Sequence, residues 1–433
     1  MSFISIYLAV RICFINFGYQ DLQTMSELTN ISFENTECAF AAKSDAELKQ
    51  ASFLFGIMDK NWLVNMALKV TPVAIRWKIP FTKSLIRATI FKQFVGGETL
   101  EQTAKVANKL QQYDVQVILD YGVEGKEGED NFEHARDEFK KVIDYASTQP
   151  NIPFMSVKVT GFARFALLEK LDAAINAAEG TLMKRYLTAV DTLPDAEKEE
   201  WHRVRLRMQQ LCEEGSEKNI GVLIDAEETW IQDPVDALTI LMMDIFNKQK
   251  VVIYNTIQLY RHDRLQFLKE SYKAAAERNF ILGAKLVRGA YMEKERERAK
   301  EMNYHSPIQP DKESSDRDYN AAVEFCITNL QKIAVIVASH NEYSNLYATQ
   351  FLDKMGLPHN HPHVHFSQLY GMSDNITFNL AKAGFSVSKY LPFGPIKDVI
   401  PYLMRRAQEN SSVSGQTSRE LVLIKKELQR RIK

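Results

Sequence analysis

The residues best suited to chemistry stand at the ends of short apolar runs. One such run, Gly283–Val287, contains Lys285 and is followed at once by Arg288, Gly289 and Tyr291. A glycine lets the backbone come close to a planar group or a pyrophosphate, and an arginine supplies charge to a phosphate. The pattern predicts a strand that leads into a ligand site and then into a helix. Taken alone, the run is also explained by a buried strand whose cations are solvated or paired at its rim.

Other apolar runs end in the same way. Polar or charged residues follow or close them at Asp120 and Glu124, Lys158, Asp225, Gln258, His340 and Asn341, Gln368, and Tyr390. Ligands of parallel α/β sheets and barrels bind beyond the carboxyl ends of the strands. Strands that close only a hydrophobic core would not need these residues, so the sequence predicts a wide polar binding surface at that end.

Two adjacent arginines form a second kind of site. Arg405 and Arg406 lie in a predicted helix after Gly394-Pro395, and Glu409 shares a face with Arg405 at a spacing of i,i+4. Two guanidinium groups can bind a carboxylate as a fork, which lysines do less well. The alternative is a solvated arginine pair on a surface helix.

The elements that must position these residues repeat along the chain. Eight strand-like runs alternate with helix-like segments, at Val115–Tyr121, Met155–Thr160, Val222–Ala226, Val251–Leu259, Ala284–Gly289, Val335–His340, Val364–Leu369 and Ser386–Leu391. This alternation predicts an α/β fold, a distorted (β/α)8 TIM-like barrel. The interval Phe165–Asn219 is too long for one helix, so we expect a helical insertion between strands two and three.

The rest of the chain is divided by its patterns. We expect an N-terminal extension over residues 1–44, a helical N-terminal region over 45–113 and the barrel with C-terminal helices over 114–433. Apolar residues at three- and four-residue steps indicate the N-terminal helices. Thr417-Ser418-Arg419-Glu420 has the form of a capping box for a last amphipathic helix, 418–432.

Several of these stretches together resemble the proline dehydrogenase (proline oxidase) family. The resemblance rests on Leu286–Tyr291, Ser388–Pro395 and Tyr402–Ser412, and it extends from about Phe94 to the C-terminus. It implies an FAD-dependent oxidation of L-proline to Δ1-pyrroline-5-carboxylate, with electrons passed to a membrane quinone and a separate pyrroline-5-carboxylate dehydrogenase as a partner. Two rival functions stay open. One is a hydroxyproline dehydrogenase or another flavin-barrel oxidoreductase, and the other is a flavin-free barrel that serves as a scaffold.

The resemblance also implies roles for individual residues. The expected FAD contacts are Ala226, Gln258, Lys285, Arg288, Gly289, Ala290, Tyr291, Ser339, His340, Asn341 and Gln368. The expected substrate contacts are Lys158, Leu286, Tyr390, Arg405, Arg406 and Glu409. Catalytic roles fall to Lys158, Asp225, Lys285 and Tyr390, and Glu124 is expected to act as a gate that pairs with Arg405.

Two of these positions need comment. Many family members have arginine in place of Lys285 and lysine in place of Arg288. A positive charge is therefore kept at both positions, but the guanidinium group stands at position 288 instead of 285. A ring as large as Tyr390 leaves little room for a hydroxyl group on the substrate, which favours proline over hydroxyproline.

Composition narrows the partners. The net charge of −1 gives no reason to expect nucleic acid, and the four scattered cysteines have no metal-ligand spacing. The segment 60–97, however, has seven cations and no acid, interleaved with aromatic residues such as Trp62 and Trp77. It suits peripheral binding to an anionic membrane surface, or else a helix pair that packs on the barrel. We therefore expect a cytoplasmic protein attached peripherally to the inner membrane, or a mitochondrial one if the source is eukaryotic.

Overall fold

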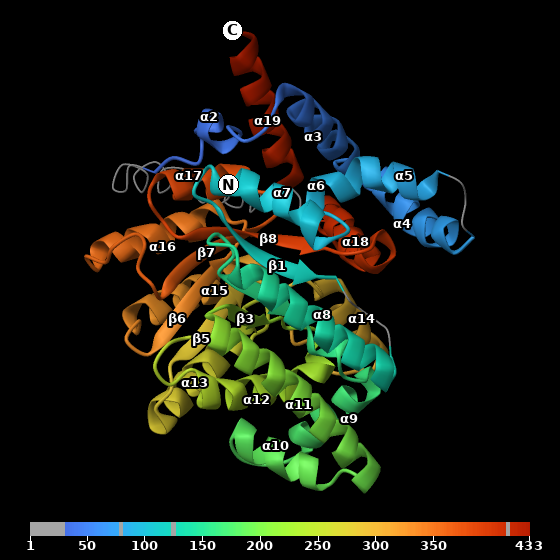
Figure 1. The fold of residues 1–433 in the computed structure, drawn as a ribbon, viewed down its shortest axis with the longest axis vertical. Coiled ribbons are helices and arrows are strands. Elements are labelled where there is room, and N and C mark those ends of the chain that lie inside the picture. The colour runs from blue at the N-terminus through green and yellow to red at the C-terminus, as the bar shows by residue number, and fades with distance from the viewer. Residues whose placement is uncertain (1–30, 78–80, 123–126, 413–415) are drawn as a thin grey trace, which may run out of the picture.

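Eight parallel strands close into a barrel in which each strand pairs with the next and β8 pairs with β1 (Figure 1). The computed structural model describes residues 31–77, 81–122, 127–412 and 416–433. The strands are β1 (Gln116–Tyr121), β2 (Phe154–Val157), β3 (Gly221–Ile224), β4 (Ile253–Gln258), β5 (Leu282–Val287), β6 (Ile333–Ala338), β7 (Val364–Leu369) and β8 (Val387–Phe393). The predicted (β/α)8 barrel is confirmed.

Alternation along the strands separates two apolar layers. Successive side chains of a strand point to opposite faces. In β6, Val335 and Val337 belong to the large core between strands and helices, whereas Ala334 and Ile336 belong to a small core inside the barrel with Leu223 of β3. Above this inner layer, the same inward positions become polar toward the carboxyl ends.

Helices cover the outside of the barrel, as the sequence predicts. They are α8 (Glu129–Ser147), α12 (Thr229–Phe246), α13 (Arg264–Arg278), α14 (Met292–Glu301), α15 (Lys312–Thr328), α16 (Glu342–Lys354) and α17 (Asp374–Lys382). Three more helices, α9 (Phe165–Ala177), α10 (Leu182–Asp191) and α11 (Asp195–Lys218), form the predicted insertion between β2 and β3. Trp201 Nε1 donates to the hydroxyl of Tyr186 at 2.9 Å and ties α11 to α10.

A second group of helices lies on the side of the barrel that is opposite to α9, α10 and α11 in Figure 1. It consists of α2 (Thr36–Ala39), α3 (Asp45–Met58), α4 (Asn61–Arg76), α5 (Thr82–Ile86), the π-helical turn η1 (Arg87–Phe91), α6 (Lys92–Phe94), α7 (Leu100–Gln111), α18 (Ile396–Ser412) and α19 (Gln416–Ile432). Phe55, Phe94 and Leu423 share a core of their own there. The helical N-terminal region is confirmed, and the exact domain boundaries stay a prediction.

The last helix departs from its predicted start. Helix α19 begins at Gln416, so Thr417 lies inside it and the predicted capping box is wrong. The side chain of Glu420 instead accepts the backbone N–H of Ser373, which follows β7. Glu420 therefore accepts from a residue distant in sequence, whereas a capping box would require it to accept from the backbone N–H of Thr417.

Among the helices of the described residues, none has the length and apolar character needed to cross a membrane.

Candidate active site

Asp225 follows β3 and lies at the centre of a charged cluster inside the barrel. Its carboxylate pairs with Lys285 of β5, and Lys158 Nζ, after β2, lies 3.9 Å from Oδ2. The hydroxyl of Tyr390 in β8 donates to the same oxygen at 2.6 Å. Lys285 Nζ also lies 5.4 Å from the centre of the Tyr390 ring. The structure therefore brings together the four residues predicted to be catalytic.

Charge and burial work against each other in this cluster. Burial alone would raise the pKa of Asp225, but Lys285 and Lys158 outweigh it and hold the pKa of this carboxyl below its usual range. Burial, together with Asp120 and Asp225, raises the pKa of Tyr390 well above its ordinary value. Asp225 is thus an anion and Tyr390 a neutral hydrogen-bond donor at neutral pH.

Ser156 joins the same cluster and was not predicted. Its hydroxyl donates to Asp120 Oδ1 at 3.1 Å and lies 2.8 Å from the hydroxyl of Tyr390. Ser156 precedes Lys158 by two residues, so both lie on the inner face as β2 reaches its carboxyl end. The two-residue spacing to Lys158 could have identified Ser156 as an inward-facing residue. The apolar residues on either side of Ser156 made this stretch resemble a strand of the hydrophobic core.

Arg288 lies just beyond β5 and points toward the helices. Its guanidinium donates to Asp316 Oδ1 at 2.8 Å, to Ser339 Oγ at 2.8 Å and to Ser344 Oγ at 2.9 Å. It also lies 4.3 Å from the centre of the Tyr319 ring. Two of the five N–H donors of an arginine therefore have no partner among the described residues.

Gly289 has a backbone conformation and a close neighbour, Tyr260, that only a glycine accommodates. Its φ of 138° lies outside the range that other residues adopt readily, and a Cβ atom there would lie 2.4 Å from the Tyr260 ring. The next residue, Ala290, is exposed, and Ala226 beside Asp225 is half-buried. These positions can present backbone groups to a ligand.

Gln258 closes β4 on the inner face of the barrel. The residue is 2% exposed, and its Nε2 donates to the carbonyl of Glu227 at 2.9 Å. Its Oε1 is buried and has no hydrogen-bond partner among the described residues. Because an unpaired buried amide oxygen costs free energy, this oxygen is suited to a donor on a ligand.

Three predicted cofactor residues follow β6. Ser339 accepts from Arg288, Asn341 caps α16 by accepting from the N–H of Ser344 at 2.9 Å, and His340 Nδ1 lies 2.9 Å from Ser373 Oγ. Loss of hydration lowers the pKa of His340 to about 3, with further effect from Lys389, Arg406 and Arg288. The imidazole is therefore neutral at physiological pH.

Two predicted ligand contacts lie on the wrong face of their strands. Leu286 is fully buried in the core between the barrel and the helices, opposite to Lys285. Gln368 Nε2 donates to the Ser339 carbonyl at 3.1 Å, and its Oε1 accepts from Thr377 at 2.8 Å. Leu286 is thus not placed to touch a substrate ring. Gln368 lies on the helix side of β7, where it holds the backbone of Ser339 by a hydrogen bond.

Leu369 is an apolar residue on the inner face of the barrel that was not predicted as a site residue. It ends β7 beside Tyr390, and it shares the inner face with His365, whose Nε2 lies 2.6 Å from Ser388 Oγ. Its side chain is half-buried at the mouth of the barrel. Strand alternation counted from His365 would have found it.

Helix α18 brings the arginine pair to this end of the barrel. The Arg405 guanidinium lies 5.8 Å from the centre of the Tyr291 ring, and that of Arg406 lies 5.3 Å from the centre of the Tyr402 ring. Arg406 is 6% exposed, and its charge contributes to the low pKa of His340. The predicted position of the arginines over the polar face is therefore consistent with the geometry.

Two predicted residues cannot be placed. Glu124 lies outside the described residues. Glu409 belongs to α18, but its side chain is also outside the described set. Their expected roles stay predictions.

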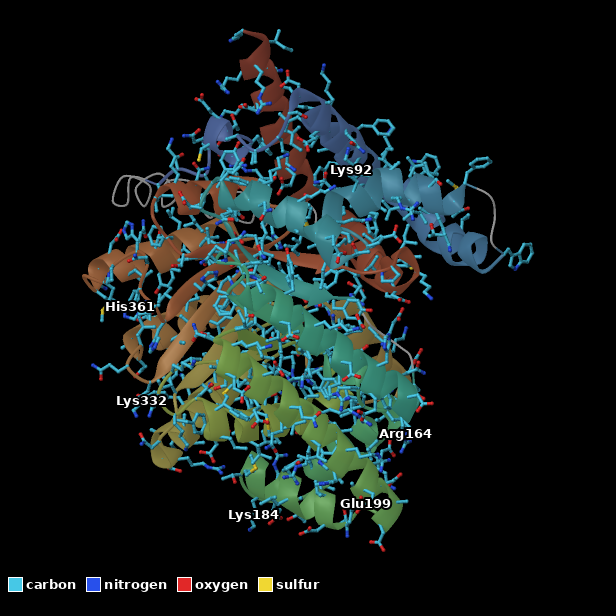
Figure 2. All side chains as sticks on the ribbon, viewed as in Figure 1. Lys92, Arg164, Lys184, Glu199, Lys332 and His361 are labelled. Carbon is cyan, nitrogen blue, oxygen red and sulfur yellow. The ribbon has the colours of Figure 1, made fainter. Side chains whose placement is uncertain are left out.

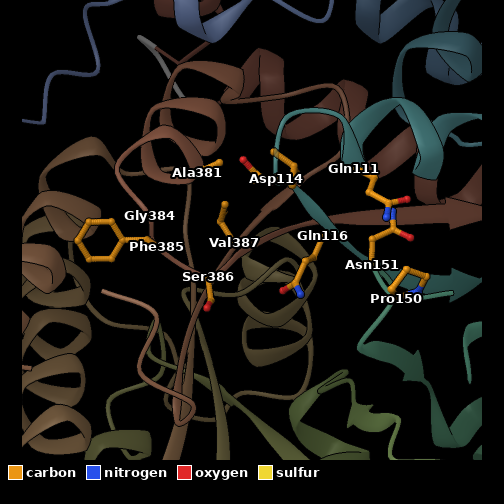
Figure 3. Close-up of a pocket in the computed structure, with 11 residues that line it drawn as sticks. Gln111, Asp114, Gln116, Pro150, Asn151, Ala381, Gly384, Phe385, Ser386 and Val387 are labelled. Atoms are coloured by element: carbon orange, nitrogen blue, oxygen red, sulfur yellow. The ribbon is translucent and has the colours of Figure 1, made fainter. Parts of the chain in front are cut away.

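A pocket at the opposite end of the barrel has a different character (Figure 3). Its volume is about 340 Å³, and it lies where β1 and β8 begin, lined by Gln111, Asp114, Val115, Gln116, Pro150, Asn151, Ala381, Gly384, Phe385, Ser386 and Val387. The amino-terminal face of such barrels generally serves stability. None of the predicted site residues lines it.

Known proteins share this sequence pattern. A family model described as Proline dehydrogenase matches residues 103–419. Proline dehydrogenase 1, mitochondrial, of Dictyostelium discoideum is 30% identical over 433 residues, which cover 92% of this chain and 75% of that protein. Hydroxyproline dehydrogenase of Xenopus laevis is 31% identical, with 91% of this chain and 89% of that protein covered.

The fold has solved counterparts. Proline utilization A from Bdellovibrio bacteriovorus, in a crystal structure of the enzyme inactivated by N-propargylglycine, matches with a TM-score of 0.70 and 19% sequence identity. The match covers 90% of this chain and 42% of that longer one. At this identity the likeness speaks for the fold alone.

Proposed function

The chain belongs to the proline dehydrogenase family and is therefore an oxidoreductase of proline; from this premise we propose that it converts L-proline to Δ1-pyrroline-5-carboxylate with FAD and passes the electrons to a membrane quinone. A separate pyrroline-5-carboxylate dehydrogenase would consume the product. The observation that supports the proposal best is the cluster of Lys158, Asp225, Lys285 and Tyr390 on the inner face, together with Arg405 of α18, which lies 5.8 Å from the centre of the Tyr291 ring.

One observation in particular supports the fit of the described residues to FAD. The buried Oε1 of Gln258 lacks a hydrogen-bond partner among the described residues. The free N–H donors of Arg288 and the capped start of α16 beside Asn341 suit phosphate oxygens. Lys285, being a cation near the inner face, would favour an anionic reduced form of the cofactor.

The reaction removes a hydride from C5 of proline and a proton from its nitrogen, so that a C=N bond forms. FAD, when bound, supplies the two-electron acceptor for this chemistry. Arg405 and Arg406 bind the substrate carboxylate, and the Tyr390 ring forms one wall of the pocket. Asp225 fixes that ring by accepting from its hydroxyl and holds Lys285 in place. These contacts orient the substrate, which is the contribution expected of the protein.

An absorption spectrum tests the proposal directly. The purified protein should be yellow, and anaerobic addition of L-proline should bleach the visible flavin band. A colourless protein that gains no band from added FAD would favour the scaffold function. A flavin band that proline leaves unchanged would contradict proline oxidation.

A second candidate substrate follows from the similarity to hydroxyproline dehydrogenase. Tyr390→Ser is expected to lower kcat/KM for proline roughly tenfold and to narrow the gap to hydroxyproline, because the freed space admits a hydroxyl group. The check is the ratio of the two kcat/KM values. Tyr390→Phe is the control, since it removes the hydrogen bond to Asp225 and keeps the ring. If serine leaves the ratio unchanged, Tyr390 does not select the substrate.

The segment 60–97, which we call the arm, is our proposed membrane contact. Helices α4 and α5 extend away from the barrel in Figure 1. Trp62, Trp77 and Phe81 of the arm are 66%, 75% and 85% exposed, which is unusual for large apolar side chains. The described cations Lys60, Lys69 and Lys83 are exposed as well, whereas Arg87 pairs with Glu98. Exposed aromatics beside cations suit the interface of an anionic membrane.

This arm predicts binding that weakens with salt. The triple variant Lys60→Gln, Lys69→Gln, Lys83→Gln should co-sediment with anionic phospholipid vesicles roughly a hundredfold less well than wild type at low salt, at ~1 kcal/mol per cation. Salt should release the wild type, since the screening length falls to ~3 Å at 1 M.

The control has the same charge change elsewhere. Lys184, Lys273 and Lys300 are exposed on the barrel side, and Figure 2 shows Lys184 at the opposite end from Lys92. Their replacement by glutamine should leave binding near the wild-type level. Equal losses in both triple variants would mean that net charge, and not the arm, governs binding.

A further inference from the structure

Glu420 is an acid buried in the C-terminal helix. It is 5% exposed, and its carboxylate accepts the backbone N–H of Ser373. Burial and the nearby Asp374 raise the pKa of Glu420 to about 7. A buried acid needs a partner to be tolerated, and here the partner is the loop after β7. Glu420 therefore binds α19 to the carboxyl end of the barrel.

Ser373 connects this contact to the candidate site. Its φ of 51° is left-handed, which is uncommon for a residue other than glycine and persists only when its surroundings hold it. Its N–H is held by Glu420, and its Oγ lies 2.9 Å from Nδ1 of His340. A chain of three residues thus runs from α19 to the end of β6.

The loop that contains Ser373 is confined on its other side. Gln93 of α6 donates from Nε2 to the carbonyl of Gly371 at 2.7 Å, and a Cβ atom at Gly371 would lie 2.1 Å from the Gln93 carbonyl oxygen. Beyond the loop, Asp374 pairs with Lys389 at 2.8 Å and with Lys43 at 3.3 Å. These contacts fix the backbone on both sides of Ser373, and Glu420 fixes the N–H of Ser373 itself.

We propose that Glu420 is a positioning residue of the cofactor site, which fixes the His340 ring through Ser373. The proposal rests on the proposed function, because it takes His340 as a contact of FAD. A neutral imidazole has one nitrogen that donates and one that accepts. Anchoring Nδ1 at Ser373 determines the role and the direction of Nε2. Without the anchor the ring can rotate, and its hydrogen bond to a ligand is lost for part of the time.

The test is the dissociation constant of FAD, measured by titrating the apoprotein and following flavin fluorescence. Glu420→Ala should raise Kd roughly tenfold, the effect of one hydrogen bond. Glu420→Gln should stay within about twofold of wild type, because its amide oxygen still accepts from Ser373. The matched control is Glu427→Ala, a buried acid of the same helix that pairs with Arg430 and Arg431 and should leave Kd unchanged.

A second variant separates positioning from folding. Ser373→Gly removes the hydroxyl group and suits the left-handed backbone, so it should weaken FAD binding while thermal stability is kept or increased. In a His340→Ala background, Glu420→Ala should add no further loss of affinity, because the residue it acts through is gone.

The outcomes are distinct. If wild type binds FAD and Glu420→Ala binds it equally well, the inference is wrong and the proposed function stands. Equal losses with and without His340 would show that Glu420 acts only on stability, which also overturns the inference. If wild type binds no FAD, the proposed function fails and the inference with it.

Discussion

Replacement of Asp225 by alanine should lower the free energy of unfolding by ~3–5 kcal/mol, because it leaves the Lys285 ammonium buried without its anion. Lys285 is only 5% exposed, and Lys158 and Tyr390 lose their acceptor in the same change. Urea titration of the apoprotein measures the effect without dependence on the cofactor. FAD binding and proline oxidation should fall as well.

The sign of the pH dependence follows from the direction of the shift. The pKa of Asp225 is depressed below 3.8, so its contribution to stability is fully present above that value and is lost as the pH falls through the folded-state pKa. The difference between wild type and Asp225→Ala should therefore be full at pH 7 and should shrink only in acid. A difference that instead peaks in acid would contradict the assignment of Asp225 as a buried anion.

Two controls test whether the loss of stability comes from the buried ion pair. Glu228 pairs with Lys294, whose side chain is 58% exposed, so Glu228→Ala should cost less than about 1 kcal/mol through that pair. Replacing both partners, as in Asp225→Leu with Lys285→Met, should recover much of the stability, since a buried pair can often be exchanged for apolar groups. Failure of the double variant to recover any stability would show that the loss comes from the contacts of Asp225 with Lys158 and Tyr390 and not from its pair with Lys285.

Arg405→Met and Arg406→Met should each raise KM for proline roughly ten- to a hundredfold, because a charge-assisted contact contributes ~1.5–3 kcal/mol. Methionine keeps much of the side-chain volume and removes the guanidinium group that would bind the carboxylate. FAD content, measured from the visible absorbance of the purified variants, should stay near the wild-type value. Steady-state kinetics over a wide range of proline concentration measures the change in KM.

The matched control for the arginine pair is Arg298. Its guanidinium lies 4.3 Å from the centre of the Trp230 ring and pairs with Glu169, so it is a stacked, partly buried arginine that already has partners of its own. Arg298→Met should leave KM unchanged. An unchanged KM in both Arg405→Met and Arg406→Met would remove the carboxylate fork from the proposed mechanism.

The sequence predicted the barrel well for a physical reason. Parallel strands that are covered on the outside give long apolar runs, and the inward positions at their carboxyl ends turn polar, as at Lys158, Asp225 and Lys285. The same regularity reveals the error at Leu286. Adjacent residues of a strand face opposite ways, so a residue next to Lys285 could not also face the interior. The expected role of Leu286 rests on the family resemblance, and alternation along β5 contradicts it.

Other features depend on contacts between distant parts of the chain. Glu420 has the spacing of a capping box, and no local pattern indicates that Ser373 will take its carboxylate instead. Ser156 was missed for a related reason, since its importance comes from Asp120 and Tyr390 on two other strands. Local patterns specify strands and helices, but they do not specify which buried polar groups will meet.

The joining of residues near the two ends of the described chain bears on how the protein is made. Arg419 pairs with Glu34, and these residues are 385 positions apart. At ~5–20 residues per second of synthesis, the segment around Glu34 waits on the order of 20 to 80 seconds on the ribosome before its partner exists. Phe33, which is buried in the folded protein, likewise waits for Asn375, whose Nδ2 donates to the Phe33 carbonyl. The contact between Arg419 and Glu34 can therefore form only late, after α19 has been synthesised.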